Sequence, residues 1–192
     1  RSYLPDQEIT GMVIRHGESF GMSDRWTVWD GERAVYRPTV SYVYHPCEAA
    51  LASLARVREN QYRFPEEMRI LERNDIISGS DTLGALLMGH PYRSWWTGSI
   101  LSIEDADSLV PGQNATTIQV GIGMVAAVMW LITNPREGFC LPDDLPYDVI
   151  LNTALPYLGE FRSEPAEWSP VTNPGEGDAA WQVEEFIARL HP

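Results

Sequence analysis

The chain has 192 residues, of which 44% are hydrophobic, and it carries a formal net charge of −13. That length suits one ordinary domain with a core of its own. The negative charge argues against nucleic-acid binding, because phosphate contacts need a basic face. An acidic surface concentrates small cations, although solubility is the commoner reason for such a charge. All fourteen basic residues are arginines, which excludes a Schiff-base lysine and a phosphate-loop lysine within this sequence.

The sequence contains no obvious membrane or secretion signal. A membrane-spanning helix needs about 20 consecutive apolar residues, and the most apolar window, residues 118–132, is interrupted by Gly121 and Gly123. The first residues are polar, unlike a signal peptide. The two cysteines, Cys47 and Cys140, have no metal-ligand spacing, so we expect reduced thiols and a cytoplasmic location. The chain begins with an arginine instead of methionine, which suggests a piece of a longer protein.

The first half of the chain is predicted to be rich in β-strands. Asp30-Gly31 lies between two short runs of β-branched and aromatic residues, which is a strong signal for a hairpin. Pro38 precedes another such run, at a position where no ladder hydrogen bond is lost. Residues 19–23 are expected to form a loop. The expected strands are residues 8–15, 26–29, 34–36, 39–44, 68–77, 83–88 and 94–101.

The second half is predicted to be mostly helical. Ser102 is expected to cap a short helix that Pro111 ends. The next helix, residues 114–133, is apolar nearly all round, so we expect it to be buried. Residues 161–177 are rich in Pro, Glu and Gly and are expected to form an extended tail. The expected helices are residues 47–58, 102–110, 114–133, 147–155 and 179–190.

These elements predict an α+β fold, with a mixed and largely antiparallel sheet in the first half followed by helices. The predicted division is a β-rich part, residues 1–110, and a helical part, residues 111–192.

His16 and Glu18 are the candidate catalytic residues. If residues 8–15 form a strand that continues to Glu18, then His16 and Glu18 point the same way, because alternate side chains of an extended chain share a face. A carboxylate and an imidazole aimed into one space can bind and deprotonate an ammonium group. The alternative is a buried polar pair tied to Arg15 or to the backbone, and the residues alone slightly favour that alternative.

Two other motifs resemble cofactor sites and are rejected here. The run from His16 to Glu18, followed by Pro46-Cys47, resembles a zinc deaminase, but Ala50 stands where the last cysteine ligand is needed, so no metal is expected. Residues 121–126 match the glycine pattern of a dinucleotide-binding turn. The strand that should follow is replaced by a loop with Pro and Gly at residues 134–141, so close helix packing explains these glycines better.

Several separate blocks of sequence, in order, resemble bacterial homospermidine synthase, a family related to the saccharopine dehydrogenases. The resemblance covers nearly all of the chain up to about Pro170, and it is strongest toward the C-terminal part of the family. The blocks are residues 12–18, 36–39, 42–47, 87–90, 113–116 and 155–159.

The resemblance implies an enzyme that makes homospermidine from two putrescines, or from spermidine and putrescine, with NAD as the hydride carrier. It places His16 and Glu18 in the diamine pocket, with Glu18 pairing with an ammonium and His16 orienting substrate or assisting a proton transfer. Tyr44 and His45 are further candidates for substrate binding, although a structural role for His45 is equally open. Asn114 and Thr116 are weak candidates for contacts with the cofactor.

The resemblance also implies that this chain is the substrate-side or dimerisation part of a two-domain, dehydrogenase-like enzyme. The nucleotide-binding domain is absent from this sequence, and residues 111–192 would dock on it. The expected partners are a diamine or polyamine and either a second copy of the chain, as in a homodimer, or a companion chain with the Rossmann domain. Two alternatives are a non-catalytic module for polyamine binding or oligomerisation, and another amine dehydrogenase of the saccharopine type.

Overall fold

The computed structural model describes residues 1–72 and 74–169. Their contacts divide the chain into two compact units, each described by itself below. Of the described residues, 1–68 and 168–169 belong to unit 1, and those between 69 and 167 belong to unit 2. The predicted division of the chain into a β-rich part and a helical part at residue 110 is not tested by these contacts and stays a prediction.

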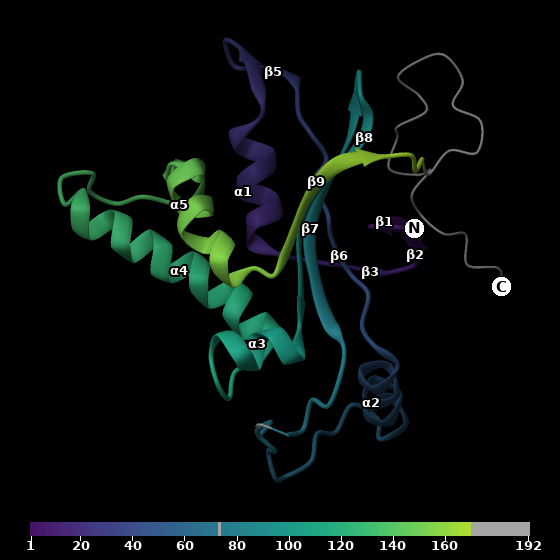
Figure 1. Cartoon of the computed structure of the whole chain (residues 1–192). Coiled ribbons are helices and arrows are strands. Elements are labelled where there is room, and N and C mark those ends of the chain that lie inside the picture. Colours follow the sequence, from purple (N-terminus) through teal and green to yellow (C-terminus); the bar gives the residue numbers. More distant parts are fainter. Residues whose placement is uncertain (73, 170–192) are drawn as a thin grey trace, which may run out of the picture. The chain divides into compact units, whose positions relative to one another are not determined.

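Unit 1 contains three small antiparallel sheets of two strands each (Figure 1). The pairs are β1 (Ser2–Leu4) with β2 (Gln7–Ile9), β3 (Met12–Ile14) with β6 (Tyr42–Tyr44), and β4 (Val28–Asp30) with β5 (Arg33–Tyr36). Gly31 turns the β4–β5 hairpin with a φ of 59°, so the hairpin predicted from Asp30-Gly31 is confirmed.

Two helices complete unit 1, and the first of them corrects the sequence-based expectation. α1 (Gly17–Arg25) occupies the segment expected to be a loop, and α2 (Glu48–Glu59) matches the predicted helix. Glu18 in the first turn and Arg25 in the last turn suit the helix dipole, which the loop prediction overlooked. The single strand expected over residues 8–15 is also wrong, because it is divided into β2 and β3. Gly11 lies between them, where a Cβ would come within 2.5 Å of Val43.

Unit 2 is built on one three-stranded antiparallel sheet in the order β7-β8-β9 (Figure 1). β7 (Ser80–His90) and β8 (Arg93–Ser102) form the predicted pair of long strands. β9 (Glu160–Ala166) adds to the free edge of β8, so the extended tail expected from residue 161 is wrong up to Ala166. Proline and glutamate made this segment resemble a tail, but an edge strand tolerates Pro165. The strand expected over residues 68–77 is also wrong, because none of the residues described there forms one.

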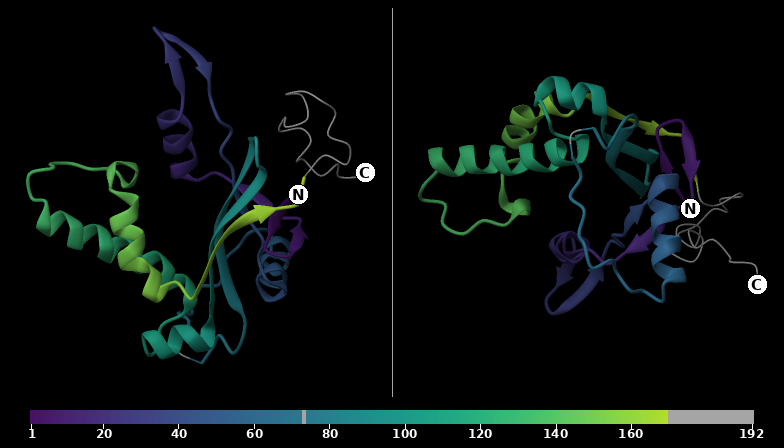
Figure 2. Two further views of the ribbon diagram at one scale, coloured as in Figure 1. Left: turned by 45° about the horizontal axis from the view of Figure 1, so that its top comes forward. Right: turned by 90° about the horizontal axis from the view of Figure 1, so that it is seen from below.

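Three α-helices complete the described part of unit 2, and the first of them begins at the predicted Ser102 cap. They are α3 (Ile103–Leu109), α4 (Ala115–Thr133) and α5 (Tyr147–Ala154). The Ser102 hydroxyl accepts a hydrogen bond from the Asp105 N–H, and the Asn114 side chain accepts one from the Thr117 N–H. α4 and α5 contact each other, and Figure 2 shows both helices to one side of the sheet.

The core of unit 2 lies where β8, α3 and the first half of α4 meet. Leu101 and Ala106 are fully buried there, and Ile118 of α4 packs against them. Trp96 is 1% exposed, and it fills the space left by Gly84, where a Cβ would come within 2.5 Å of the indole ring.

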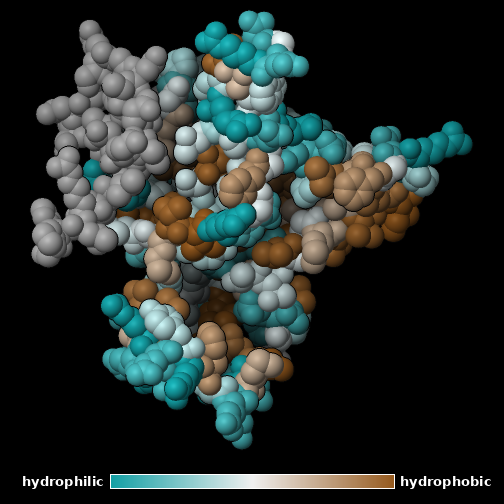
Figure 3. Space-filling view, turned by 180° about the vertical axis from the view of Figure 1, so that it is seen from behind, coloured by the Kyte–Doolittle hydropathy of each residue, from teal (hydrophilic) through white to brown (hydrophobic). Residues whose placement is uncertain are grey.

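α4 is less buried than expected, which corrects the prediction of a fully buried helix. One stripe, including Ile118, Ile122 and Ala126, packs inward, while the rest of this uncharged helix is open. Figure 3 shows hydrophobic side chains gathered on the part of unit 2 formed by α4 and α5. α4 is also long and apolar enough to cross a membrane, a test that core helices of soluble proteins pass as well. The exposed apolar residues of α4 are Val120, Met124, Val125, Val128, Met129, Leu131 and Ile132.

The α+β class and the antiparallel pairing are therefore confirmed, but the arrangement of the strands differs from the prediction. The described residues form four separate sheets, and the largest takes its last strand after the helices. The predicted helix at residues 179–190 and the end of the predicted tail lie outside the described residues.

Candidate functional site

His16 and Glu18 meet, but through a helix start and not through an extended chain. His16 is the N-cap residue of α1, with extended dihedral angles of −135° and 140°, and Glu18 stands in the first helical turn. The His16 Nδ1 contacts the Glu18 Oε2 as a hydrogen-bonded pair. The His16 carbonyl accepts a hydrogen bond of 2.7 Å from the Ser19 hydroxyl, which fixes the first turn of the helix. The predicted neighbours are thus in place, although the predicted strand geometry was wrong.

Tyr42 completes this cluster, and the sequence analysis did not single it out. In the β3–β6 pair, Tyr42 lies opposite Ile14, two residues before His16. Its ring stacks on the His16 imidazole, with 4.0 Å between ring centroids and 8° between ring planes. Alternation along the expected strand places Tyr42 on the same face as Tyr44, but it does not indicate that either ring lies beside His16.

The surroundings of Tyr42 keep its phenol neutral. Burial raises the pKa of Tyr42 above its ordinary value of 10.0, and the negative charges of Glu18 and of an ionised Tyr44 raise it further. The phenol is therefore a hydrogen-bond donor as well as an acceptor throughout the physiological pH range. The Coulomb effect also shows that the Glu18 carboxylate acts on Tyr42.

This arrangement suits a cation. The His16 and Glu18 side chains are 33% and 49% exposed, so solvent and small solutes reach them. A carboxylate binds an ammonium through a charge-assisted hydrogen bond. A tyrosine face within about 6 Å adds a cation–π attraction. We call His16, Glu18 and Tyr42 the carboxylate–aromatic cluster.

Tyr44 and His45, the other predicted substrate-binding residues, differ in their position. Tyr44 is 47% exposed and lies on the same face of β6 as Tyr42. The His45 Nδ1 is 3.1 Å from the Thr10 carbonyl oxygen, so one ring nitrogen is hydrogen-bonded to the backbone. A substrate-binding role for either residue stays a prediction.

Asn114 and Thr116, the weak cofactor candidates, belong to unit 2 and use their polar groups within it. Asn114 caps α4, and the Thr116 hydroxyl donates to the Asp81 carboxylate of β7. The glycine pattern of residues 121–126 lies inside α4, away from any turn after a strand. The described residues therefore do not fit a dinucleotide site of the usual kind. Among them, no three His, Cys, Asp or Glu side chains gather as metal ligands.

An open groove of about 620 Å³ lies beside α1 in unit 1. Val13, Ile14 and Phe20 form its apolar wall, and the segment from Arg37 to Ser41 faces them. The Arg15 guanidinium stacks over the Phe20 ring at 5.5 Å from the ring centroid. The remaining lining residues are Ser19 and Ser23.

Comparison with known proteins gives relatives for nearly the whole chain. No protein-family model matches it. It is 37% identical to a homospermidine synthase from Blastochloris viridis and 33% identical to one from Mesorhizobium japonicum; each match covers 98% of this chain and 41% of the relative. The crystal structure of the homospermidine synthase from Legionella pneumophila, in complex with NAD, superposes with a TM-score of 0.84 and 37% identity. That match covers 92% of this chain and 38% of the Legionella chain.

The chain is a homologue of homospermidine synthase. The family resemblance inferred from separate sequence blocks is thereby confirmed. The chain spans about two fifths of the length of the curated relatives that it matches.

Proposed function

We propose that this chain forms the substrate-side part of a homospermidine synthase-like enzyme, which makes homospermidine from putrescine or from spermidine and putrescine. Homology to homospermidine synthases over 98% of the chain supports the reaction class. The observation that carries the proposal is the carboxylate–aromatic cluster, in which Glu18 contacts His16 and the ring of Tyr42 stacks on that of His16. Protonated diamines combine ammonium ends with an apolar stem, and this cluster offers an anion beside two ring faces.

Each residue of the cluster has a distinct proposed task. Glu18 binds the ammonium group and orients the carbon next to it. His16 takes a proton from the amine when the nitrogen must become neutral, and its contact with Glu18 stabilises the resulting imidazolium. Tyr42 packs against the imidazole and fixes the plane of its ring.

NAD chemistry would come from outside this chain. When bound, NAD would supply the hydride exchange of the proposed reaction. The Legionella relative is a complex with NAD, but the described residues here do not fit a dinucleotide site. We therefore assign no step of the hydride exchange to them. The proposed partners are a diamine or polyamine and either a second copy of the chain or a companion chain with the nucleotide-binding domain, in a cytoplasmic setting.

A product assay tests this function. The chain is incubated with putrescine, NAD and each candidate companion, and the polyamines are separated by chromatography. We expect homospermidine when a nucleotide-binding companion is present, and none when Glu18→Gln replaces the wild-type chain. The same assay with spermidine and with amino-acid amines distinguishes another saccharopine-type dehydrogenase, which would yield a different product.

A non-catalytic polyamine-binding or oligomerisation module is the second candidate. The observation that favours it is the lack of a fit to NAD among the described residues. Calorimetric binding of putrescine, with no product in the presence of every candidate companion, would support this module over the enzyme. The absence of diamine binding, with or without a companion, would contradict both the enzyme and a polyamine-binding module, and would leave only a module for oligomerisation.

A further inference from the structure

We propose that Arg37 is a positioning residue that fixes the direction of α1 and thereby holds Glu18 beside Tyr42. This inference rests on the proposed function for its biological meaning, but its geometry and its test are independent of turnover. Arg37 makes no contact in the structure with His16, Glu18 or Tyr42.

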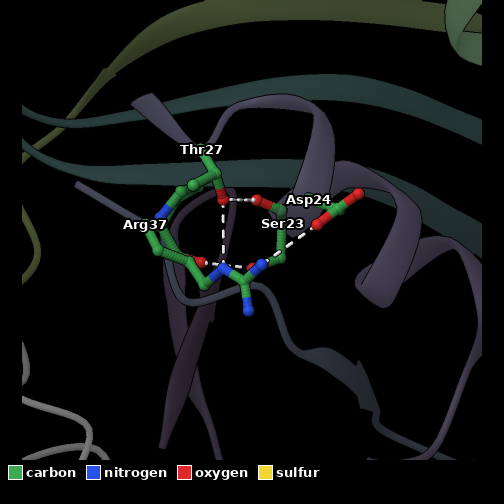
Figure 4. Close-up of polar contacts among 5 residues, drawn as sticks. Ser23, Asp24, Thr27 and Arg37 are labelled. Carbon is green, nitrogen blue, oxygen red and sulfur yellow. Dashed lines mark hydrogen bonds and ion pairs between the residues drawn. The ribbon is translucent and has the colours of Figure 1, made fainter. Parts of the chain in front are cut away.

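Figure 4 shows how Arg37 joins the end of α1 to the segment that leads to β6. The Arg37 Nε donates a hydrogen bond of 3.0 Å to the Thr27 hydroxyl, and its Nη2 lies 3.0 Å from Asp24 Oδ1. The Thr27 hydroxyl donates in turn to the Ser23 carbonyl at 2.8 Å. The Ser23 hydroxyl donates to the Pro38 carbonyl, also at 2.8 Å. We call these four hydrogen bonds the Arg37 clamp.

The clamp lies at the end of α1 opposite the carboxylate–aromatic cluster. Glu18 is five residues before Ser23, which corresponds to roughly 7.5 Å along a helix. His16, the N-cap residue of α1, has extended dihedral angles. The backbone at this end of α1 therefore does not by itself fix the direction of the helix. On the opposite side, Pro38 is four residues before Tyr42. The clamp and the ring stacking therefore connect α1 to the segment that leads into β6 at both ends of the helix. Near the end of α1, Ser23 is hydrogen-bonded to Pro38, and at its start the His16 ring stacks on the Tyr42 ring.

The hydrogen bonds of the clamp are expected to contribute unequally to holding α1 in place. The side chains of Arg37 and Asp24 are 54% and 76% exposed, so their ion pair is screened and contributes little by itself. Thr27, in contrast, is 8% exposed. Its hydroxyl both accepts from Arg37 and donates to Ser23, and a buried hydroxyl that loses its partner carries a desolvation cost. The Thr27 contact, and not the ion pair, is the part of the clamp expected to hold α1.

Tyr42 supplies a readout that distinguishes positioning from a simple charge effect. Glu18 raises the pKa of Tyr42, and Arg37 is not among the causes of that shift. Removing a positive charge acting directly on Tyr42 would raise its pKa further. Releasing α1 moves the Glu18 carboxylate away and lowers the pKa of Tyr42. The two explanations of an Arg37 variant therefore predict opposite signs.

The experiment is a pH titration of Tyr42 in the full 192-residue chain, without diamine, followed by NMR of tyrosine labelled with ¹³C at Cζ. The Tyr42→Phe variant assigns the signal. Glu18→Gln gives the shift expected when the carboxylate charge is absent altogether. We expect Arg37→Met to lower the pKa of Tyr42 by at least about half of the Glu18→Gln shift.

Three variants complete the test. Asp24→Asn removes the ion pair alone and should leave the titration of Tyr42 close to wild type. Thr27→Val should reproduce the effect of Arg37→Met, while Thr27→Ser, which keeps a hydroxyl, should not. If Arg37→Met fails to fold, the Thr27→Val and Thr27→Ser pair decides the question. A Tyr42 pKa that stays unchanged or rises when the clamp is broken would overturn the positioning role.

The outcomes also separate this inference from the proposed function. If the clamp variants shift the pKa of Tyr42 in a chain that binds no diamine, the positioning role of Arg37 is supported and the proposed function is rejected. Diamine binding that depends on Glu18, with no response of Tyr42 to the clamp variants, would keep the function and reject the clamp.

Discussion

The two units of this chain differ in how much apolar surface they bury. Nine of the ten buried hydrophobic residues among the described parts belong to unit 2, including Trp96 and Leu101, and only Ile9 belongs to unit 1. α2 of unit 1 has no buried residue, and Leu51 and Leu54 on its apolar stripe are 46% and 51% exposed. Unit 2 is therefore organised around a core, while unit 1 is organised around local hydrogen bonds and ring contacts.

This difference bears on where the proposed site lies. The carboxylate–aromatic cluster belongs to unit 1, the unit with little core, and its side chains are partly open to solvent. A carboxylate in that setting binds an ammonium weakly, since water competes for both charges. The proposed function then requires another surface to cover unit 1, and the relatives, which are more than twice as long as this chain, have additional sequence that could provide it.

The largest expected effect tests the core of unit 2. Leu101→Ala removes a fully buried side chain and should cost about 2–5 kcal/mol of the free energy of unfolding of unit 2, through lost burial and a cavity. Leu54→Ala, at a half-exposed position of unit 1, is the matched control and should cost far less. Hydrogen exchange of the β8 and α2 amides reports each unit separately. If Leu101→Ala and Leu54→Ala lowered the free energy of unfolding equally, the difference in core burial between the two units would be contradicted.

The next effect concerns the carboxylate of the site. Glu18→Gln should weaken the binding of putrescine to the assembled enzyme by about 1.5–3 kcal/mol, the value of a hydrogen bond to a charged group. Glu48→Gln is the control, because Glu48 also lies in the first turn of a helix of unit 1, α2. Calorimetry gives both affinities. An unchanged affinity for Glu18→Gln would reject Glu18 as the ammonium ligand.

A smaller effect is expected at the helix caps, which also differ between the units. Ser102 accepts a hydrogen bond from the Asp105 N–H at the start of α3, and the N-cap residues of α1 and α2 make no such bond. Ser102→Ala should therefore cost about 1 kcal/mol of the stability of unit 2. Cys47→Ala, at the N-cap of α2, should be nearly neutral. Chemical denaturation of both variants checks the difference, and a comparable cost at Cys47 would refute the role assigned to the Ser102 cap.

The smallest effect is a pH dependence that belongs to unit 1. The pKa of Tyr42 is raised above 10.0 in the folded chain, so its contribution to stability is complete below pH 10.0 and is lost as the pH rises through the folded-state pKa. Tyr42→Phe should flatten this alkaline loss, and Glu18→Gln should reduce it. Denaturation at pH values on either side of 10.0 measures the loss. An alkaline loss that is identical in all three chains would contradict the coupling of Tyr42 to Glu18.

Local signals in the sequence predicted much of the fold. The Asp30-Gly31 turn, the Ser102 cap and the strands expected over residues 83–88 and 94–101 each depend on neighbouring residues, and each was predicted correctly. The error at residues 161–166 arose where a distant contact decides the structure. β9 becomes a strand because β8 offers it a free edge, and no residue within 160–166 indicates that edge.

The candidate site shows the same limit. His16 and Glu18 were predicted as neighbours because only one residue separates them in the chain, and they do meet. Tyr42 was missed because its ring reaches His16 only through the pairing of β3 with β6. Three of the four hydrogen bonds of the Arg37 clamp likewise join residues that are 10 to 15 positions apart. Neither contact has a local motif by which the sequence alone could indicate it.

The titration of Tyr42 in the presence of putrescine tests the account most directly. An ammonium bound by Glu18 cancels much of the negative charge that raises the pKa of Tyr42. The account predicts that saturating putrescine lowers this pKa in the wild-type chain and leaves it unchanged in Glu18→Gln, at matched ionic strength. A Tyr42 titration that does not respond to putrescine, or that responds equally in both chains, would show that the diamine binds elsewhere or not at all.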